Sequence, residues 1–285
     1  MHHNDCYLGY PMKLVKQSLL VFIFACTPLV SEAKNPFSTD FVLDPYQIES
    51  SSELAYLNSK YSINSVIFKN TDESRFINYT QGLSIGLPQQ FQVGIFETYA
   101  NPLHKNPLNP GEGKSGLKAP LFSADKLMSY SDNLAFKASL SIKPNLTGSK
   151  EILNTYQVGI LAISKVKADL DLSLGYSRTR YELAKTDADI FTLVMSKKFD
   201  EDTLLNLRYD ATKWSATATT LGNFSSSMGH QLSAEISTSV AKDLWVGVNA
   251  TYYYNKCNFT PVSLPIEYTN KTDLYNVSGV IKFLF

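Results

Sequence analysis

The chain has 285 residues with 26 basic and 26 acidic side chains, so its formal net charge at pH 7 is zero. A neutral chain lacks the surplus of Lys and Arg that binding to nucleic acid requires, so we expect no nucleic-acid partner. Only Cys257 of the three cysteines lies after residue 33, which excludes an internal disulfide in that part of the chain.

The first recognisable segment runs from Met12 to Ala33, MKLVKQSLLVFIFACTPLVSEA. Two lysines precede an apolar run too short for a transmembrane helix, and the segment closes on a small-x-small cleavage site. This predicts a secretory signal over residues 1–33, with Met12 as a candidate true start, and a single mature domain over 34–285. An alternative makes Cys26 the lipidated residue of a lipoprotein, although the bulky residue two positions earlier disfavours that processing.

The lead-in over residues 34–50, KNPFSTDFVLDPYQIES, is polar and poor in strand patterns. It precedes a long region of alternating apolar and polar residues that is rich in Tyr and Phe, with 17 and 16 in the chain. If that region closes into a barrel, we expect the lead-in to lie in the lumen as a plug.

Strict alternation with a period of two is clearest in the second half of the chain, for example in LDLSLGYS (170–177) and QLSAEISTSV (231–240). Such segments have one apolar and one polar face. Their length of about 10 to 13 residues suits a tilted membrane crossing. The charged residues on the polar face then need water, which a lumen supplies.

We therefore predict an all-β fold, a closed antiparallel transmembrane β-barrel of about twelve strands, with ten or fourteen as alternatives. The predicted strands are 50–68, 75–87, 91–99, 116–124, 133–143, 151–165, 168–181, 188–199, 203–214, 230–240, 243–255 and 273–285. The fourth is weak because Pro120 interrupts it. Short turns are expected at 88–90, 165–167, 200–202 and 241–243, and long loops at 100–115, 215–229 and 256–272 on the opposite side of the membrane.

The last strand, DLYNVSGVIKFLF, ends on a bare phenylalanine. Its apolar parity is similar to the C-terminal signal that the bacterial barrel-assembly machinery reads, and we predict that machinery as a partner. Ile281 stands where the commonest signals have an aromatic residue, and Gly279 replaces a larger apolar one. The predicted signal residues are Tyr275, Val277, Ile281, Phe283 and Phe285.

The polar parity of the strands predicts a lumen of mixed charge. In an open channel these residues would set ion selectivity, and in a narrow barrel they would pair across the lumen and close it. We expect Arg208 and Glu235, on neighbouring strands, to interact. The predicted lumenal set is Lys137, Asp169, Asp171, Arg208, Asp210, Glu235 and Asn249.

Arg178 and Arg180 continue the lipid-facing parity past Tyr176. At the outer rim they are candidates for contact with lipopolysaccharide phosphates, which Arg binds bidentately. A solvated strand end is the alternative interpretation.

Three segments resemble one family: the hairpin YTQGLSIGLPQQFQVGIFETYA (79–100), the phrase IKPNLTG (142–148) and the strand pair over 157–177. They are similar to the outer-membrane transporter family named for the meta-cleavage pathway of phenol degradation. Its members share a Gly-containing strand, a tight turn, an apolar strand and later a Pro-x-Thr-Gly turn, here stretched to PNLTG. The resemblance implies a channel that admits small molecules, including hydrophobic or aromatic ones.

Other function classes have weaker support. A lipid hydrolase needs a Ser beside a His, but His104 lies in a predicted loop, and His230 and Ser233 are three apart and so on opposite faces of a strand. The spacing of Asp169 with Asp171 allows at most weak calcium binding, and we predict no metal and no cofactor. A non-conducting adhesin or structural barrel is the main alternative to a passive channel in the outer membrane of a Gram-negative bacterium, with membrane lipid, lipopolysaccharide and small solutes as partners.

Overall fold

The computed structural model describes residues 35–65, 69–104, 115–144, 154–181, 186–218, 222–261 and 266–285. The predicted signal over 1–33, with Met12 and Cys26, lies outside this part of the chain. No helix among the described residues has the length and apolar character needed to cross a membrane.

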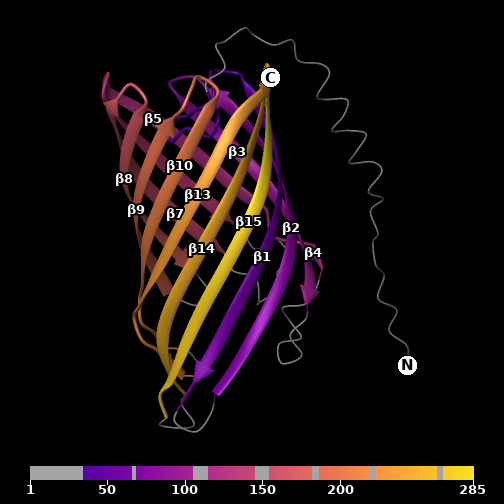
Figure 1. Ribbon diagram of the computed structural model, residues 1–285. Coiled ribbons are helices and arrows are strands. Elements are labelled where there is room, and N and C mark those ends of the chain that lie inside the picture. Colours follow the sequence, from indigo (N-terminus) through magenta and orange to yellow (C-terminus); the bar gives the residue numbers. More distant parts are fainter. Residues whose placement is uncertain are drawn as a thin grey trace.

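The described residues form fifteen strands in one antiparallel sheet (Figure 1). Each long strand pairs with the next along the chain, and β1 pairs with β15, so the sheet closes into a barrel of twelve long strands. The short β4, β11 and β12 pair with this sheet outside the ring of twelve long strands. The closed barrel confirms the predicted fold class and strand number. The strands are β1 Ile48–Asn64, β2 Lys69–Leu87, β3 Phe91–His104, β4 Gly116–Leu117, β5 Leu121–Ser131, β6 Leu134–Lys143, β7 Thr155–Lys167, β8 Leu170–Tyr181, β9 Thr186–Lys198, β10 Thr203–Trp214, β11 Thr217–Ala218, β12 Gly222–Phe224, β13 Ser227–Ala241, β14 Leu244–Pro261 and β15 Tyr268–Leu284.

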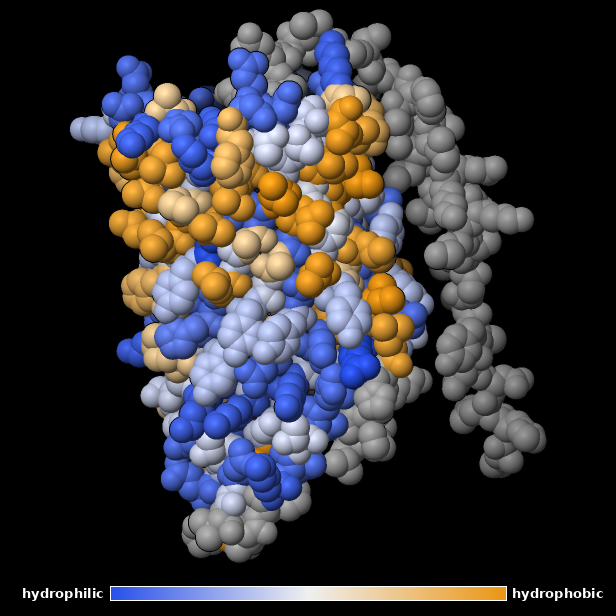
Figure 2. All heavy atoms as spheres, viewed as in Figure 1, coloured by the Kyte–Doolittle hydropathy of each residue, from blue (hydrophilic) through white to orange (hydrophobic). Residues whose placement is uncertain are grey.

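The alternation in the sequence becomes the two faces of the wall. On β8, Leu172 and Leu174 are exposed on the outside, while Asp171 and Ser173 are buried on the inside. Exposed apolar side chains are favourable only against lipid, so the wall is membrane-spanning. Figure 2 shows hydrophobic residues gathered on the half of the wall nearer the short turns. This apolar belt includes Leu54, Leu83, Ile95, Leu140, Val158, Ile160, Leu172, Leu174, Leu193, Leu232, Ile236, Val248, Val277 and Ile281.

Aromatic residues follow the belt on its side away from the short turns. Tyr176 and Phe191 lie opposite each other on β8 and β9, with ring centroids 5.4 Å apart. Tyr252 and Tyr275 do the same on β14 and β15, at 4.9 Å. Aromatic rings of this kind mark the boundary between hydrocarbon and headgroups in membrane barrels.

Four neighbouring strands continue past this boundary as a polar collar. They are β14, β15, β1 and β2, with 18, 17, 17 and 19 residues. Beyond Tyr56 the outward positions of β1 carry Asn58 and Lys60 in place of apolar residues. In Figure 1 these four strands reach to the end of the barrel opposite the C-terminus.

The connections have the predicted polarity. The turns after β2, β5, β7, β9 and β13 are short and lie at the end that holds the C-terminus, and the longer connections lie at the other end. Several boundaries were wrong; β2, for example, begins at Lys69 rather than at residue 75. The fourth long strand is β5 rather than 116–124, because Pro120 has no N–H to donate and the strand begins after it. The turn predicted at 165–167 falls at 168–169, and the loop predicted at 256–272 is mostly strand, since β14 runs to Pro261 and β15 begins at Tyr268.

The turn between β9 and β10 is ordered by one carboxylate. Asp200 Oδ1 accepts hydrogen bonds from the backbone N–H of Thr203 at 2.5 Å and of Asp202 at 2.9 Å. These bonds favour the charged form and lower the pKa of Asp200, the bond from Thr203 contributing most.

A depressed pKa in the folded state means that the carboxylate stabilises the turn above its unfolded pKa, and that this contribution is lost as the pH falls through the folded pKa. We expect the Asp200 carboxyl carbon, followed by NMR, to titrate below about 3.9, the ordinary Asp value. Because the side chain is exposed, overall stability should change little. A midpoint at or above the ordinary value would show that the turn bonds do not form.

Candidate functional site: a plugged lumen

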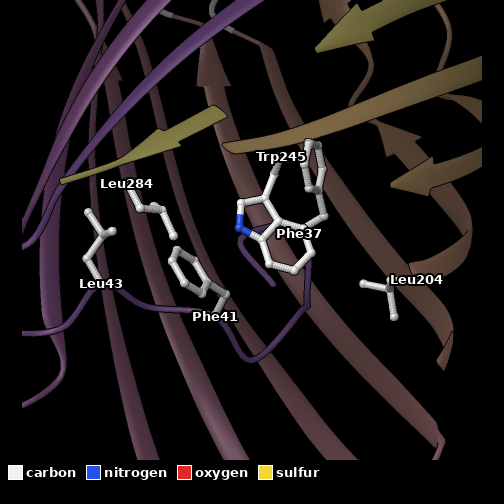
Figure 3. Packing of buried hydrophobic residues seen from close by; sticks show 6 residues of the cluster. All are labelled: Phe37, Phe41, Leu43, Leu204, Trp245 and Leu284. Atoms are coloured by element: carbon white, nitrogen blue, oxygen red, sulfur yellow. The ribbon is translucent and has the colours of Figure 1, made fainter. Parts of the chain in front are cut away.

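The chain before β1 lies inside the barrel, at the end with the short turns. We call residues 35–47 the plug. Three apolar plug residues, Phe37, Phe41 and Leu43, are buried in a cluster with Leu204, Trp245 and Leu284 of the inner wall (Figure 3). The packing confirms the predicted plug, although its last three residues, 48–50, belong to β1.

Four wall side chains bind the backbone of the plug. Lys137 Nζ donates to the Phe41 carbonyl, Lys282 Nζ to the Pro36 carbonyl and Asn206 Nδ2 to the Phe37 carbonyl, each at 2.9 Å. Gln92 Oε1 accepts from the N–H of Leu43 at 3.0 Å. The plug runs outside the sheet ladder, so its buried backbone groups need such partners. The four side chains come from β6, β15, β10 and β3 and therefore hold the plug from several sides.

Two glycines make room for the plug. A Cβ on Gly86 would lie 2.0 Å from the carbonyl oxygen of Asp44, and one on Gly247 would lie 2.8 Å from the Phe37 ring. Gly86 also exchanges backbone hydrogen bonds with the end of the plug, from Tyr46 N–H at 2.8 Å and to the Gln47 carbonyl at 2.9 Å. Where two backbones approach this closely, only glycine fits without strain, because it has no Cβ.

Lys282 is the most heavily engaged cation of the inner wall. Besides its bond to the plug, its Nζ lies 3.4 Å from a Glu49 carboxylate oxygen and 4.7 Å from the centre of the Phe37 ring. The ammonium group is thus held between a buried carboxylate and an aromatic face, which is a cation–π geometry.

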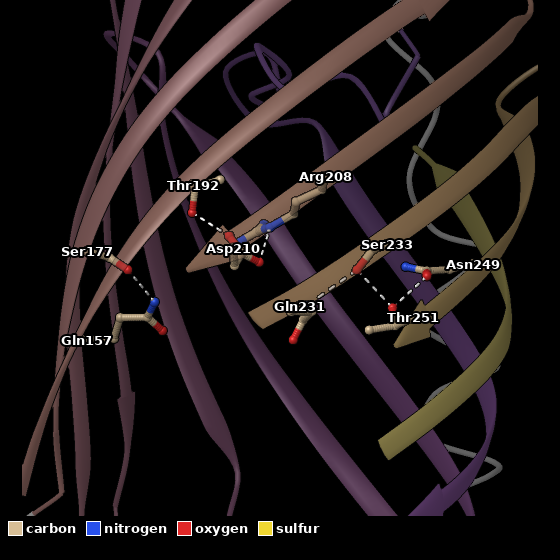
Figure 4. Close-up of polar contacts among 9 residues, drawn as sticks. All are labelled: Gln157, Ser177, Thr192, Arg208, Asp210, Gln231, Ser233, Asn249 and Thr251. Carbon is tan, nitrogen blue, oxygen red and sulfur yellow. Dashed lines mark hydrogen bonds and ion pairs between the residues drawn. The ribbon is translucent and has the colours of Figure 1, made fainter. Parts of the chain in front are cut away.

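Beyond the plug the lumen is lined by hydrogen-bonded polar side chains (Figure 4). Asp210 accepts from Thr192 Oγ1 at 2.6 Å and from Arg208 Nε at 2.7 Å. Further around the wall, Thr251 Oγ1 lies 3.0 Å from both Ser233 Oγ and Asn249 Oδ1. The inner wall beyond the plug is therefore polar and hydrogen-bonded.

Of the predicted lumenal residues, six lie on the inner wall: Lys137, Asp171, Arg208, Asp210, Glu235 and Asn249. Asp169 does not: it lies in the β7–β8 turn at the mouth, where it pairs with Lys197. That pairing lowers the pKa of Asp169, chiefly through the hydrogen bond from Lys197.

The predicted contact between Arg208 and Glu235 was wrong. The register places Ser233 opposite Arg208 and Asn206 opposite Glu235. Asn206 Nδ2 accordingly donates to Glu235 Oε2 at 3.2 Å, and Arg208 pairs with Asp210 on its own strand.

Sequence reasoning missed three plug-binding residues, Gln92, Asn206 and Lys282. Each occupies the polar parity of its strand, and Lys282 is the one charged residue among residues 275–284 of β15. This charge was the signal in the sequence that could have identified Lys282 as a plug-binding residue, because an inward charge beside an apolar plug needs a specific partner.

The remaining candidates lie on the outer face. Tyr275, Val277, Ile281 and Phe283 of the predicted assembly signal are exposed to lipid, and the backbone of Phe285 pairs with Ile48. Arg178 and Arg180 also point outward, near the end of β8 away from the short turns. Arg178 is bound by Asp187 at 2.7 Å, so part of its charge is already neutralised.

The geometry does not favour a hydrolase. Outside the barrel, His230 Nδ1 lies 2.7 Å from the Tyr209 hydroxyl, whereas Ser233 is buried on the lumenal side. The side chain of His104 lies outside the described part of the structure. Among the described residues there is no group of three or more His, Cys, Asp or Glu arranged to hold a metal ion.

A closed antiparallel wall, an apolar outer belt and a polar lumen define a porin-like transmembrane β-barrel. No family model and no curated protein matches the sequence. Solved structures with a similar fold include the KdgM porin, at 11% identity and a TM-score of 0.48 over 81% of this chain and 98% of that one.

Two further similar structures are a FadL homologue from Pseudomonas aeruginosa and a deltaS2 mutant of the TodX monoaromatic hydrocarbon channel. The first has 8% identity and a TM-score of 0.47, covering 84% of this chain and 90% of that one. The second has 9% identity and a TM-score of 0.42, covering 85% and 91%. At these values the similarities carry no argument about substrate or mechanism.

Proposed function

We propose that the chain is an outer-membrane channel for the passive passage of small molecules, with a lumen that the plug narrows at the end with the short turns. The observation that carries this proposal is the polar inner wall, which continues from the plug through Arg208, Asp210 and Asn249. A barrel with a purely structural role has no need for charge that faces water in its interior, and Arg208, although it pairs with Asp210, remains about half exposed to the lumen.

The class of solute follows from the inner surface and from the family resemblance. The resemblance to the phenol meta-pathway family implies small hydrophobic or aromatic molecules. Phe37 and Phe41 of the plug and Phe96 of β3 line a cavity inside the barrel and supply aromatic contacts for such solutes.

The outer face supports three further proposals about partners. The apolar belt contacts membrane lipid, Arg178 and Arg180 contact lipopolysaccharide phosphates, and the strand from Tyr275 to Phe285 is read by the barrel-assembly machinery. The ion pair between Arg178 and Asp187 makes Arg180 the stronger of the two phosphate-binding candidates.

Two lumenal substitutions test the channel. Replacing Arg208 with Ala removes a positive charge from the inner wall, so the reversal potential in a salt gradient should shift toward cation selectivity. Glu235→Gln removes a negative charge and should shift it toward anions. Both shifts are to be measured on the folded chain in a planar bilayer, starting from the wild-type value.

Arg178→Ala is the matched control, because it removes the same charge from the lipid-facing side and should leave selectivity unchanged. Equal selectivity in all four proteins would contradict the assignment of Arg208 and Glu235 to the conducting path. A folded barrel that stays silent even without its plug would favour the alternative, a non-conducting surface barrel whose polar collar binds a partner.

A further inference from the structure

A cavity of about 380 Å³ lies inside the barrel between the plug and the wall formed by β13, β14, β15, β1, β2 and β3. Its volume falls in the range of about 300–1,000 Å³ that is usual for small-molecule sites. Its floor is the plug and its sides are strands, so a bound molecule would contact both the plug and the wall.

One part of the cavity is aromatic. Phe37 and Phe41 contribute from the plug, and Phe96 contributes from β3. The cavity already contains one ammonium group against an aromatic face, since Lys282 Nζ lies 4.7 Å from the centre of the Phe37 ring. The contact of Lys282 with the Phe37 ring is therefore the same cation–π contact that an organic cation would make in this cavity.

The charges around the cavity favour a cationic guest. Three carboxylates, Glu49, Glu53 and Glu235, face two ammonium groups, Lys137 and Lys282. Both lysines are committed to plug carbonyls, and Lys282 also lies 3.4 Å from Glu49. Among the described residues, Glu235 is bound only by the neutral amide of Asn206, and Glu53 has no hydrogen-bond or ion-pair partner.

A buried hydroxyl on the same wall also lacks a partner. Ser278 lines the cavity from β15 with only 2% of its surface exposed, and its Oγ makes no hydrogen bond within the described structure. A buried polar atom without a partner costs free energy, and rotation of the Ser278 side chain toward the cavity would let its hydroxyl accept a hydrogen bond from a ligand with N–H donors.

We propose that this cavity binds a small organic ammonium ion with an aromatic or other apolar body. The ammonium group would lie between Glu53 and Glu235, within reach of the Ser278 hydroxyl, and the apolar body would rest against Phe37, Phe41 and Phe96. The inference rests on the proposed channel only in that the solute reaches the cavity through the lumen.

Calorimetric titration of the folded full-length barrel in detergent, with a detergent blank subtracted, tests the site. The probes are phenethylammonium, its neutral analogue 2-phenylethanol and the anion phenylacetate. We expect saturable binding of the ammonium ion, about ten-fold weaker binding of the alcohol and no binding of the anion, because charge-assisted hydrogen bonds are lost with the charge. Equal binding of all three probes would overturn the proposal.

Two variants locate the site, and a third controls for the change in charge. Glu53→Gln and Glu235→Gln should each weaken binding of phenethylammonium by about ten-fold while the barrel remains folded. Glu97→Gln removes a carboxylate from the exposed outer face of β3 and should bind like the wild type. Unchanged binding in the first two variants would overturn the assignment.

The same preparations are to be tested for conductance. A barrel that conducts but binds no ammonium ion would refute this inference and leave the proposed function intact. A barrel that binds the ammonium ion yet stays silent with its plug removed would refute the channel and leave the site.

Discussion

Deletion of residues 35–44 should raise the single-channel conductance of the folded barrel several-fold. The plug narrows the lumen with three buried apolar side chains and is held by hydrogen bonds from Lys137, Lys282 and Asn206. Without it those three side chains face water, and the polar inner wall continues to the mouth. The measurement is current through single barrels in a planar bilayer, after each preparation is shown to be folded by its resistance to unfolding in detergent.

A replacement of equal length separates packing from mere bulk. If residues 35–44 are exchanged for Gly and Ser, the segment is flexible and loses its aromatic anchors. We expect brief, noisy closures in that variant and steady openings in the deletion. If the deleted barrel is folded and its conductance equals that of the wild type, the plug does not limit passage.

The substitution Gly86→Ala should loosen the plug without damage to the barrel. The new Cβ would lie 2.0 Å from the backbone oxygen of Asp44, which no side-chain rotation can relieve. Overpacking of this kind costs about 1–3 kcal/mol, and here the segment that must move is the end of the plug bound to Gly86. Limited proteolysis should then cut the plug faster than in the wild type, and conductance should rise toward that of the deletion.

Gly279→Ala provides the comparison. This glycine lies on the outer face of β15, and a Cβ there meets nothing within 4 Å. We expect a change in stability within about 0.5 kcal/mol and wild-type proteolysis of the plug. Equal behaviour of the two alanine variants would show that the close approach of Gly86 to the plug has no part in holding it.

The wall could be predicted from the sequence because the membrane imposes a simple rule. Each outward position must be apolar and each inward position meets water, so strands such as β8 show their two faces directly in the sequence. That rule stops at the membrane boundary. The outer parts of β14 and β15 have polar residues on the outward face, so the segment 256–272 lacks the apolar parity of a membrane strand and is interpreted from the sequence as a loop.

The contacts between side chains of the inner wall could not be predicted from the alternation alone. The period of two places Arg208 and Glu235 on the inner face, but the register between β10 and β13 decides which residues meet, and it brings Asn206 to Glu235. The plug could be expected from its polar sequence, whereas its partners could not. Lys282 and Pro36 are separated by 246 positions, and Asn206 and Phe37 by 169. Nothing local in the sequence connects residues so far apart.

The polar collar separates the part of the barrel that is anchored in the membrane from the rim that faces water. At about 3.3 Å per residue and a tilt of about 40°, the 19 residues of β2 rise about 48 Å, against an apolar band of about 25 Å. On the side of β14, β15, β1 and β2 the rim of the barrel therefore stands roughly 20 Å clear of the hydrocarbon. Residues on that rim can diversify in size and charge without any penalty from lipid, so the surface that the barrel presents to water can evolve independently of how it is held in the membrane.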